Sequence, residues 1–433
     1  MIKPEIPANE EARQEELRSY SIMDTLPEKE YDEITALASQ ICETPISLIS
    51  LLDDTRQWFK SHHGIEASEA PKELAFCAHA INDQVNPLIV PDSRMDERFH
   101  DNPFVIDDPN VIFYAGIPLV TPNGFPIGTL CVIDKIPKQL DESQVKALVM
   151  LSNQLMKLLE LRKDKVELEL KNKAIKDSID YAQKIQYSIL PDINEIKKHL
   201  PNLFHYYNPK DIIGGDFYWF FKDNNYSYIA TIDCTGHGIP GALMSMTVHS
   251  LLNEIVILGK VTSPGQILTL LHTKLYETLQ QEKGDEYSQD GCDLSFCRID
   301  FLNMELTYAG AHNDIYSCDG KSVSRLKVSK KSIGGLSMLG ASELNREFFD
   351  NTIAISDNLM LILTSDGILD QLNLQNQPFG AEEFQTCISD LYQVHPENMS
   401  ELFASRINQW MNGVTQQDDQ LLIGIKFIYA PNN

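Results

Sequence analysis

The chain has 433 residues, of which 43% are hydrophobic and 23% are charged. It carries 62 acidic and 36 basic residues, a formal net charge of -26 at pH 7 that repels a phosphate backbone, so nucleic acid is excluded as a main partner. The length exceeds what one hydrophobic core usually serves, which favours two domains joined by a connector.

The N-terminus reads MIKPEIPANEEARQEEL and lacks the apolar stretch of a secretion signal. No run of roughly 18 apolar residues is present, so we expect a cytoplasmic protein without a membrane partner. The eight cysteines show no CxxC pair and no zinc-ligand spacing, which is typical of buried thiols in a reducing compartment. Cys77 stays open as either a packing residue or a ligand-sensing or redox thiol.

The first part of the chain predicts a compact α+β domain at residues 1–160. Apolar positions recur at helical spacing over residues 10–40, and the run PISLISLLD at 45–53 suits a buried strand. Two further apolar runs within residues 111–134 are separated by Pro122-Asn123-Gly124, which predicts a hairpin. We expect an antiparallel sheet with flanking helices.

This region resembles the GAF family from about residue 20 to residue 160. The motifs that carry the resemblance are Gln57-Trp58-Phe59-Lys60, Phe76-Cys77-Ala78-His79-Ala80-Ile81, Pro91-Asp92-Ser93-Arg94, Asp96-Glu97-Arg98-Phe99, Phe113-Tyr114-Ala115-Gly116, Pro118-Leu119 and Gly128-Thr129-Leu130-Cys131-Val132-Ile133-Asp134. The resemblance implies a sensor whose small-molecule effector, if there is one, binds a pocket walled by the sheet. No Cys-His dipeptide of the bilin-binding kind is present, and the identity of the ligand stays open.

A connector is expected at residues 161–191. From Gln144 to Pro191 the chain contains neither Gly nor an earlier Pro, which predicts one long helix. A heptad seam is formed by Leu161, Leu168, Ile175, Ala182 and Ile189. The seam predicts a dimerising coiled coil and hence a homodimer, with a solvated amphipathic connector as the alternative.

The remaining part, residues 192–433, predicts an α/β sandwich with a carboxylate-lined edge. Short apolar runs bounded by turn residues read YSYIATIDC, CDLSFCRID, MELTYAGAH and LMLILTSDG, and a helical stretch, residues 241–259, lies between the first two. Aspartates at or just beyond the ends of apolar runs are Asp216, Asp233, Asp366 and the pair Asp418-Asp419. Carboxylates converging from separate strand ends suit hard divalent cations, although a single such aspartate usually marks only a turn.

The order GGDFYW, DCTGHGIPGALMSM, TYAGAHN, TSDGILD and DDQLLIGI resembles the metal-dependent PPM-type serine/threonine phosphatases, in the branch similar to the sporulation stage II protein E phosphatase. The resemblance implies an α/β/β/α sandwich and two Mn²⁺ or Mg²⁺ ions. It also implies a phosphorylated protein substrate, such as an anti-sigma-factor antagonist, and direct attack of water on phosphorus without a phosphoenzyme.

By position, the resemblance implies that Asp233 bridges both metal ions and that the backbone carbonyl of Cys234 completes the ligands of one. Asp216 is implied for the second ion. The first ion is implied for Asp366 and Asp418, with Asp419 beside a further, weaker ion.

Two histidines have open roles. His237 either gives a proton to the leaving seryl oxygen or caps the helix expected to start at Pro240. His312 is either satisfied by the backbone or touches substrate or metal. Two departures from the branch pattern, Leu421 in place of Thr and Asp293 in place of a small hydroxyl residue, leave the metal affinity and a third ion open.

Two other functions compete with this prediction. Gly214-Gly215-Asp216-Phe217 is similar to part of the diguanylate cyclase signature GGDEF, but the acidic residue before Phe is missing. The second is a non-catalytic relay that uses a phosphatase fold to bind a partner. Such relays usually lose a metal aspartate, whereas this chain keeps all four, so we predict an enzyme.

Overall fold

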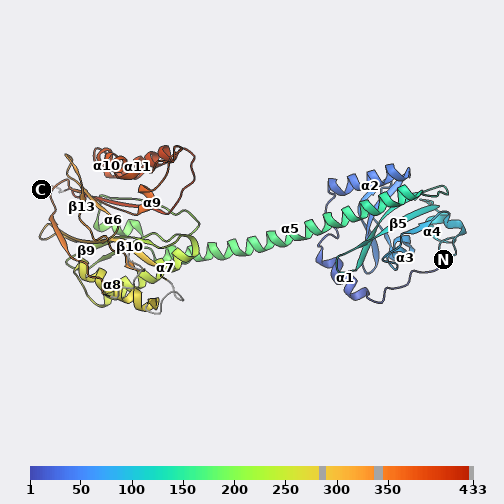
Figure 1. Ribbon diagram of the computed structural model, residues 1–433, viewed down its shortest axis with the longest axis horizontal. Helices are drawn as coiled ribbons and strands as arrows, with labels where there is room; N and C mark the ends of the chain where they lie inside the picture. The colour runs from blue at the N-terminus through green and yellow to red at the C-terminus, as the bar shows by residue number, and fades with distance from the viewer. Residues whose placement is uncertain (282–288, 336–344, 429–433) are drawn as a thin grey trace. The chain divides into compact units, whose positions relative to one another are not determined.

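The computed structural model describes residues 1–281, 289–335 and 345–428 (Figure 1). It divides into two compact units, Met1–Ala174 and Ile175–Asn433. The boundary falls inside one helix, α5 (Glu142–Ile189), so each unit contains a part of that helix. The single long helix expected from the sequence is confirmed.

The first unit is built on a six-stranded antiparallel sheet in the order β3-β2-β1-β6-β5-β4. Its strands are β1 Ile46–Leu52, β2 Arg56–His63, β3 Glu69–Pro71, β4 Leu88–Val90, β5 Phe113–Val120 and β6 Pro126–Asp134. Its other helices are α1 Glu10–Ser19, α2 Lys29–Cys42, η1 Lys72–Leu74, α3 Phe76–Ala80, η2 Ser93–Met95 and α4 Pro103–Ile106. The predicted buried strand and the predicted hairpin, β5 to β6, are both confirmed.

Both faces of this sheet are covered, which explains why all of β1 is buried. On one face, Ile49 and Leu51 pack with side chains of α1, α2 and α5. On the other face, Leu48 and Leu52 pack with α3 and the loops around it. Alternate residues of one strand thus serve two different cores, as the two-residue period of a β-strand requires.

The second unit contains two antiparallel sheets. The first is six-stranded, with β15-β11-β10-β9-β8 in order and β14 paired to β10; the second is five-stranded, in the order β13-β12-β16-β17-β7. The strands are β7 Leu203–Asn208, β8 Phe217–Lys222, β9 Ser227–Cys234, β10 Gly291–Asp300, β11 Glu305–Ala311, β12 Ile315–Cys318, β13 Val323–Leu326, β14 Ile333–Gly334, β15 Asn351–Ala354, β16 Met360–Thr364 and β17 Gln420–Lys426.

The helices of this unit lie on the outer faces of the two sheets and give layers that run α/β/β/α (Figure 1), except for the short helix at residues 193–199, which packs into the core between the sheets. They are α6 Ile193–His199, α7 Gly238–Leu252, the π-helical segment η3 Asn253–Leu258, α8 Pro264–Thr278, α9 Asp366–Leu369, α10 Gly380–Tyr392 and α11 Pro396–Met411. Side chains of α7 and α8 pack on the first sheet, and those of α10 and α11 pack on the second. A third core lies between the sheets, where Ile229 of β9 meets Leu363 of β16.

One segment, Gly238–Leu258, is long and apolar enough to cross a membrane by length and composition alone. It comprises α7 and η3, and half of its most apolar window is buried inside the unit. Val248, Leu252 and Ile255 belong to the core under the first sheet. An apolar helix of this kind is what the core of a sandwich needs, so the segment is weak evidence for a membrane span.

Candidate active site

The predicted ligand residues gather where the two sheets of the second unit come together. Asp233 lies at the end of β9, and Asp216 directly precedes β8, both in the first sheet. Asp366 follows β16 and opens α9, while Asp418 lies just before β17, both in the second sheet. Residues about 200 positions apart in sequence therefore reach one region because their strands end at the same edge.

A polar cavity of about 360 Å³ occupies this edge. Its lining includes Asp233, Cys234, Asp293, Asp366 and Asp418. Three of the predicted metal-ligating carboxylates, together with the residue whose carbonyl was expected to join them, thus face one space. The lining supplies the oxygen-rich surface that hard divalent cations prefer.

Asp216 is not among the residues that line this cavity, and it is 2% exposed. Its Oδ2 atom is buried without a hydrogen-bond partner in the described part of the chain. Burial raises the pKa of Asp216 well above its usual value, and the charges of Asp419 and Asp366 raise it further. An orphaned buried carboxylate oxygen costs free energy unless a cation or donor compensates it, so this atom fits a metal ligand.

The carboxylates also act on one another. Burial raises the pKa of Asp233 well above its usual value, and the negative charges of Asp216 and Asp366 raise it further. Burial likewise raises the pKa of Asp366. Across residues 1–281, 289–335 and 345–428, however, no three His, Cys, Asp or Glu side chains converge tightly enough to form a ready-made metal cluster. A bound cation would lower the electrostatic cost of bringing these carboxylates closer together.

Asp419 has a different environment from Asp418. It is 2% exposed and does not line the cavity. Its Oδ1 accepts a hydrogen bond from the Lys210 backbone N–H at 2.7 Å, and its Oδ2 accepts one from Gly215 at 2.6 Å. The carboxylate therefore holds the loop that carries Asp216 in position through these backbone hydrogen bonds.

Two glycines allow backbone segments of the site to pack closely against each other. A Cβ at Gly215 would lie 2.8 Å from the Cys234 carbonyl oxygen, and one at Gly367 would lie 2.0 Å from the Asp419 carbonyl oxygen. Real Cβ atoms do not tolerate such distances, so side chains here would push the Asp216 loop and α9 away from the cavity.

The structure corrects one reading of His237. Helix α7 begins at Gly238, two residues before Pro240, and the His237 side chain makes no capping hydrogen bond to it. Instead, His237 Nδ1 lies 2.7 Å from Asp211 Oδ2. Sequence reasoning missed Asp211, which carries no motif of its own.

His312 is also held by a carboxylate, not only by the backbone. Its Nδ1 lies 2.7 Å from Asp293 Oδ2, and its φ of 64° places it in the left-handed region that few residues adopt. Asp293 stands directly opposite Asp233 in the pairing of β10 with β9. The sequence flagged Asp293 only as a departure from a pattern; the strand register that brings it to the cavity is tertiary information.

The second unit has relatives among known proteins. Residues 223–428 match the family described as Stage II sporulation protein E (SpoIIE). The solved SiaA-PP2C domain of Pseudomonas aeruginosa superposes with a TM-score of 0.54 and 26% identity, covering 59% of this chain and 98% of that chain. The match range contains Asp233, Asp366 and Asp418 and begins after Asp216.

Two curated proteins are similar over part of their length. Phosphoserine phosphatase RsbP of Bacillus subtilis is 26% identical over 198 residues, 45% of this chain and 46% of that protein. Cyclic di-GMP phosphodiesterase PA2567 of Pseudomonas aeruginosa is 39% identical over 138 residues, 32% of this chain and 23% of that protein. The chain thus spans less than half of the length of these curated relatives. Residues 223–428 form a phosphatase domain of the SpoIIE family.

Proposed function

We propose that this chain is a metal-dependent protein phosphatase that hydrolyses phosphoserine or phosphothreonine on a regulatory protein, such as an anti-sigma-factor antagonist. One observation carries the proposal: Asp233, Asp366 and Asp418, from two different sheets, line one polar cavity beside the unpaired oxygen of Asp216. All charged groups in the lining of this cavity are carboxylates, which repel a phosphate ester, so the cavity needs cations to bind one.

Two Mn²⁺ or Mg²⁺ ions fit this donor set. Asp233 would be a ligand of both ions. Asp216 and the Cys234 carbonyl would complete the ligands of one ion, and Asp366 and Asp418 would complete those of the other. When bound, such ions would supply Lewis-acid chemistry, lowering the pKa of a water and neutralising charge on phosphoryl oxygens.

The chain's own groups orient the substrate and handle the proton. Asp211 holds the ring of His237 beside Gly236, a cavity-lining residue, and the protonated ring would donate to the leaving seryl oxygen. Asp293, which lines the cavity, holds the His312 ring in the same way.

The proposed activity is tested by hydrolysis of an aryl phosphate and of phosphoserine peptides during titration with Mn²⁺ or Mg²⁺. We expect turnover that appears with the metal and disappears with a chelator. Metal-independent turnover, or none at any metal concentration, would contradict the proposal; the second result would favour a non-catalytic relay.

The end of α5 contacts the loop that carries Asp216. Within the second unit, Gln183 Nε2 donates a hydrogen bond to the Ile212 carbonyl at 2.7 Å. Gln186, which is 4% exposed, donates to the Gly214 carbonyl at 2.7 Å and to Ser245 Oγ at 3.0 Å. This helix end therefore fixes the backbone two residues before a proposed metal ligand, which supports control of the site through the helix.

Replacing Gln186 with Ala should lower turnover. The Gly214 carbonyl would lose a buried partner, at a cost of about 1–3 kcal/mol. The same loss of about 1–3 kcal/mol in the transition state, caused by a shift of the Asp216 loop, would lower kcat by about 5- to 160-fold. The measurement is Mn²⁺-dependent kcat and the metal concentration for half activity. Lys184→Ala, at an exposed position of the same helix, is the matched control, and equal kcat for both variants would contradict the coupling.

We further propose that the first unit is a GAF-type sensor for a small-molecule effector of open identity. A cavity of about 860 Å³ on one face of its antiparallel sheet, lined by residues that include Leu48, Phe59 and Phe76, supports this proposal. Removing residues 1–160 should change kcat or the metal requirement, because the sensor would no longer bias α5. Unchanged values of both would contradict regulation by this unit.

The proposal extends to assembly and location. The seam residues Leu161, Leu168 and Ile175 are 66%, 58% and 58% exposed, so an apolar helix face is open to a second copy of the chain. This supports a homodimer through a coiled coil. The eight free, buried cysteines are in keeping with a reducing cytoplasm.

A further inference from the structure

Two cysteine thiols meet at the wall of the cavity in the first unit. Cys77, on α3, belongs to the cavity lining, and Cys131, on β6, is fully buried next to it. Their Sγ atoms lie 3.9 Å apart. Cys42 and Cys297, by contrast, lie inside apolar cores, while Cys234 and Cys292 line the polar cavity of the second unit.

Polar groups surround the Cys77 sulfur in a way that suits a thiolate. Ser50 Oγ and Tyr114 Oη each donate a hydrogen bond to Cys77 Sγ at 3.2 Å. Ser50 Oγ is in turn 2.9 Å from the hydroxyl of Thr129. All these side chains are buried, so their alignment is fixed by packing and is present before any reactant arrives.

The acidities of the two thiols differ. Burial raises the pKa of Cys77, but hydrogen bonds involving Cys131, Ser50, Thr129 and Tyr114 outweigh it and lower the pKa from 9.0 to about 6. The hydrogen bond to Cys77, together with burial, raises the pKa of Cys131 well above 9.0. Burial raises the pKa of Cys42 to about 11, the usual outcome for a core thiol.

We propose that Cys77 and Cys131 are a reactive dithiol pair, a modification site that a small peroxide entering the cavity converts to a disulfide. The Cys77 thiolate attacks one peroxide oxygen, the O–O bond breaks, and a proton is taken up, so that Cys77 sulfenic acid and water form. The Cys131 sulfur then attacks Cys77 Sγ, and the sulfenic oxygen leaves as a second water. Two thiols and one hydrogen peroxide thus give one disulfide and two waters.

The order of the two steps follows from the contacts. Only Cys77 lines the cavity, so it meets the peroxide first. Once Cys77 is a neutral sulfenic acid, the thiolate charge that opposes ionisation of Cys131 is gone, and Cys131 becomes the better nucleophile. A disulfide is about 2 Å long, so the sulfurs must close from 3.9 Å by side-chain rotation and a small movement of α3. The bond would join α3 to β6 and reshape the cavity wall.

The test uses the full chain and hydrogen peroxide. The protein is treated, remaining thiols are alkylated under denaturing conditions, and peptides are mapped by mass spectrometry before and after reduction. We expect a Cys77–Cys131 cross-linked peptide to appear while Cys42, Cys297 and Cys387 remain alkylated. Oxidation of Cys77 no faster than that of Cys297 would overturn the proposal.

Two variants separate the steps. In Cys131→Ser, peroxide should leave a sulfenic acid at Cys77 that dimedone traps, and in Cys77→Ser, Cys131 should stay reduced. Dimedone labelling at another cysteine in Cys131→Ser, or oxidation of Cys131 in Cys77→Ser, would contradict the assignment. Because the cross-link is read in the unaltered chain, the test stands even if a variant fails to fold. It involves no phosphatase assay, so its outcome is independent of the proposed function.

Discussion

Replacing Asp233 with Asn should abolish metal-dependent phosphatase activity without weakening the fold. Asp233 lies among the other carboxylates of the cavity, with its pKa raised by burial and by Asp216 and Asp366. Losing a shared ligand removes several kcal/mol of transition-state stabilisation. Since about 1.4 kcal/mol corresponds to a factor of ten, kcat should fall by at least about 10³-fold.

The stability of the same variant provides the sharper check. Without metal, the neutral amide of Asp233→Asn would not repel the neighbouring carboxylates, so the denaturation midpoint of the metal-free variant should equal or exceed that of the unaltered protein. Added Mn²⁺ should then stabilise the unaltered protein by mass action and the variant much less. Asp390→Asn, on the exposed side of α10, is the matched control for both readouts. A variant that keeps its activity, or that loses it only because it unfolds, would refute the assignment.

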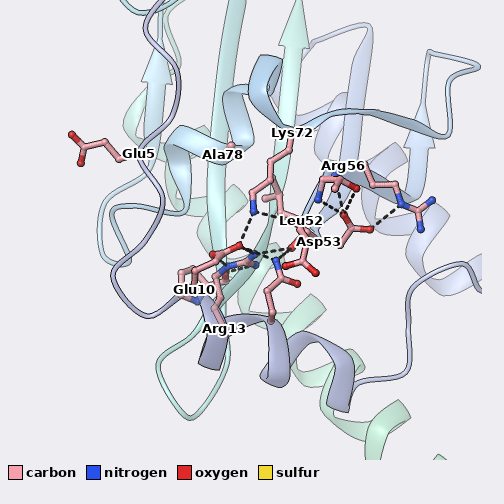
Figure 2. Close-up of polar contacts among 12 residues, drawn as sticks. Glu5, Glu10, Arg13, Leu52, Asp53, Arg56, Lys72 and Ala78 are labelled. Atoms are coloured by element: carbon pink, nitrogen blue, oxygen red, sulfur yellow. Dashed lines mark hydrogen bonds and ion pairs between the residues drawn. The ribbon is translucent and has the colours of Figure 1, made fainter.

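Replacing Arg13 with Ala should strongly destabilise the first unit. Arg13 is fully buried, and its Nη2 donates to the Leu52 carbonyl at 2.9 Å and to Glu10 Oε1 at 2.8 Å. Figure 2 shows this network, in which Lys72 reaches the same Glu10 oxygen at 2.6 Å. Lys72 would still pair Glu10 after the change, so the expected cost is that of losing the charged donor of the Leu52 carbonyl, about 1.5–3 kcal/mol.

The measurement is chemical denaturation followed by a probe in the first unit, such as Trp58 fluorescence. Arg18→Ala, with a mostly exposed side chain on the same helix, should change stability by no more than about 0.5 kcal/mol. Similar midpoints for the two variants would show that the buried network contributes little.

The network also predicts a pH dependence. Burial raises the pKa of Glu10, but hydrogen bonds from Arg13, Gln14 and Lys72 outweigh it and lower the pKa from 4.5 to about 2. A folded-state pKa below the unfolded one means that the contribution is complete above pH 4.5 and disappears as the pH falls towards 2. The difference in stability between the unaltered protein and Arg13→Ala should therefore shrink over this range.

Much of the architecture was predictable because local patterns determined it. The absence of Gly and Pro from Gln144 to Leu190 predicted α5, and Pro122-Asn123-Gly124 between apolar runs predicted the hairpin of β5 and β6. Asp233 and Asp366 could be assigned to one edge because each lies at the end of an apolar strand, and sheets bring strand ends together.

The rest depends on contacts that no local pattern encodes. Asp418 and Asp419 are neighbours with the same chemistry, yet only Asp418 lines the cavity, because successive side chains of an extended segment point in opposite directions. Asp293 reaches the cavity only through the register that pairs it with Asp233. The contacts of Asp211 with His237 and of Asp293 with His312 were missed for the same reason, since each pair joins separate segments.

The division of the carboxylates between two sheets has a mechanical consequence. Asp216 and Asp233 belong to one layer of the sandwich, and Asp366 and Asp418 belong to the other. Ions shared among them would therefore link the two sheets at one edge, and this link would form only after the sheets have packed together. Metal binding and the distance between the two sheets would then be coupled. Any motion that moves the sheets apart would separate the ligands and stop catalysis.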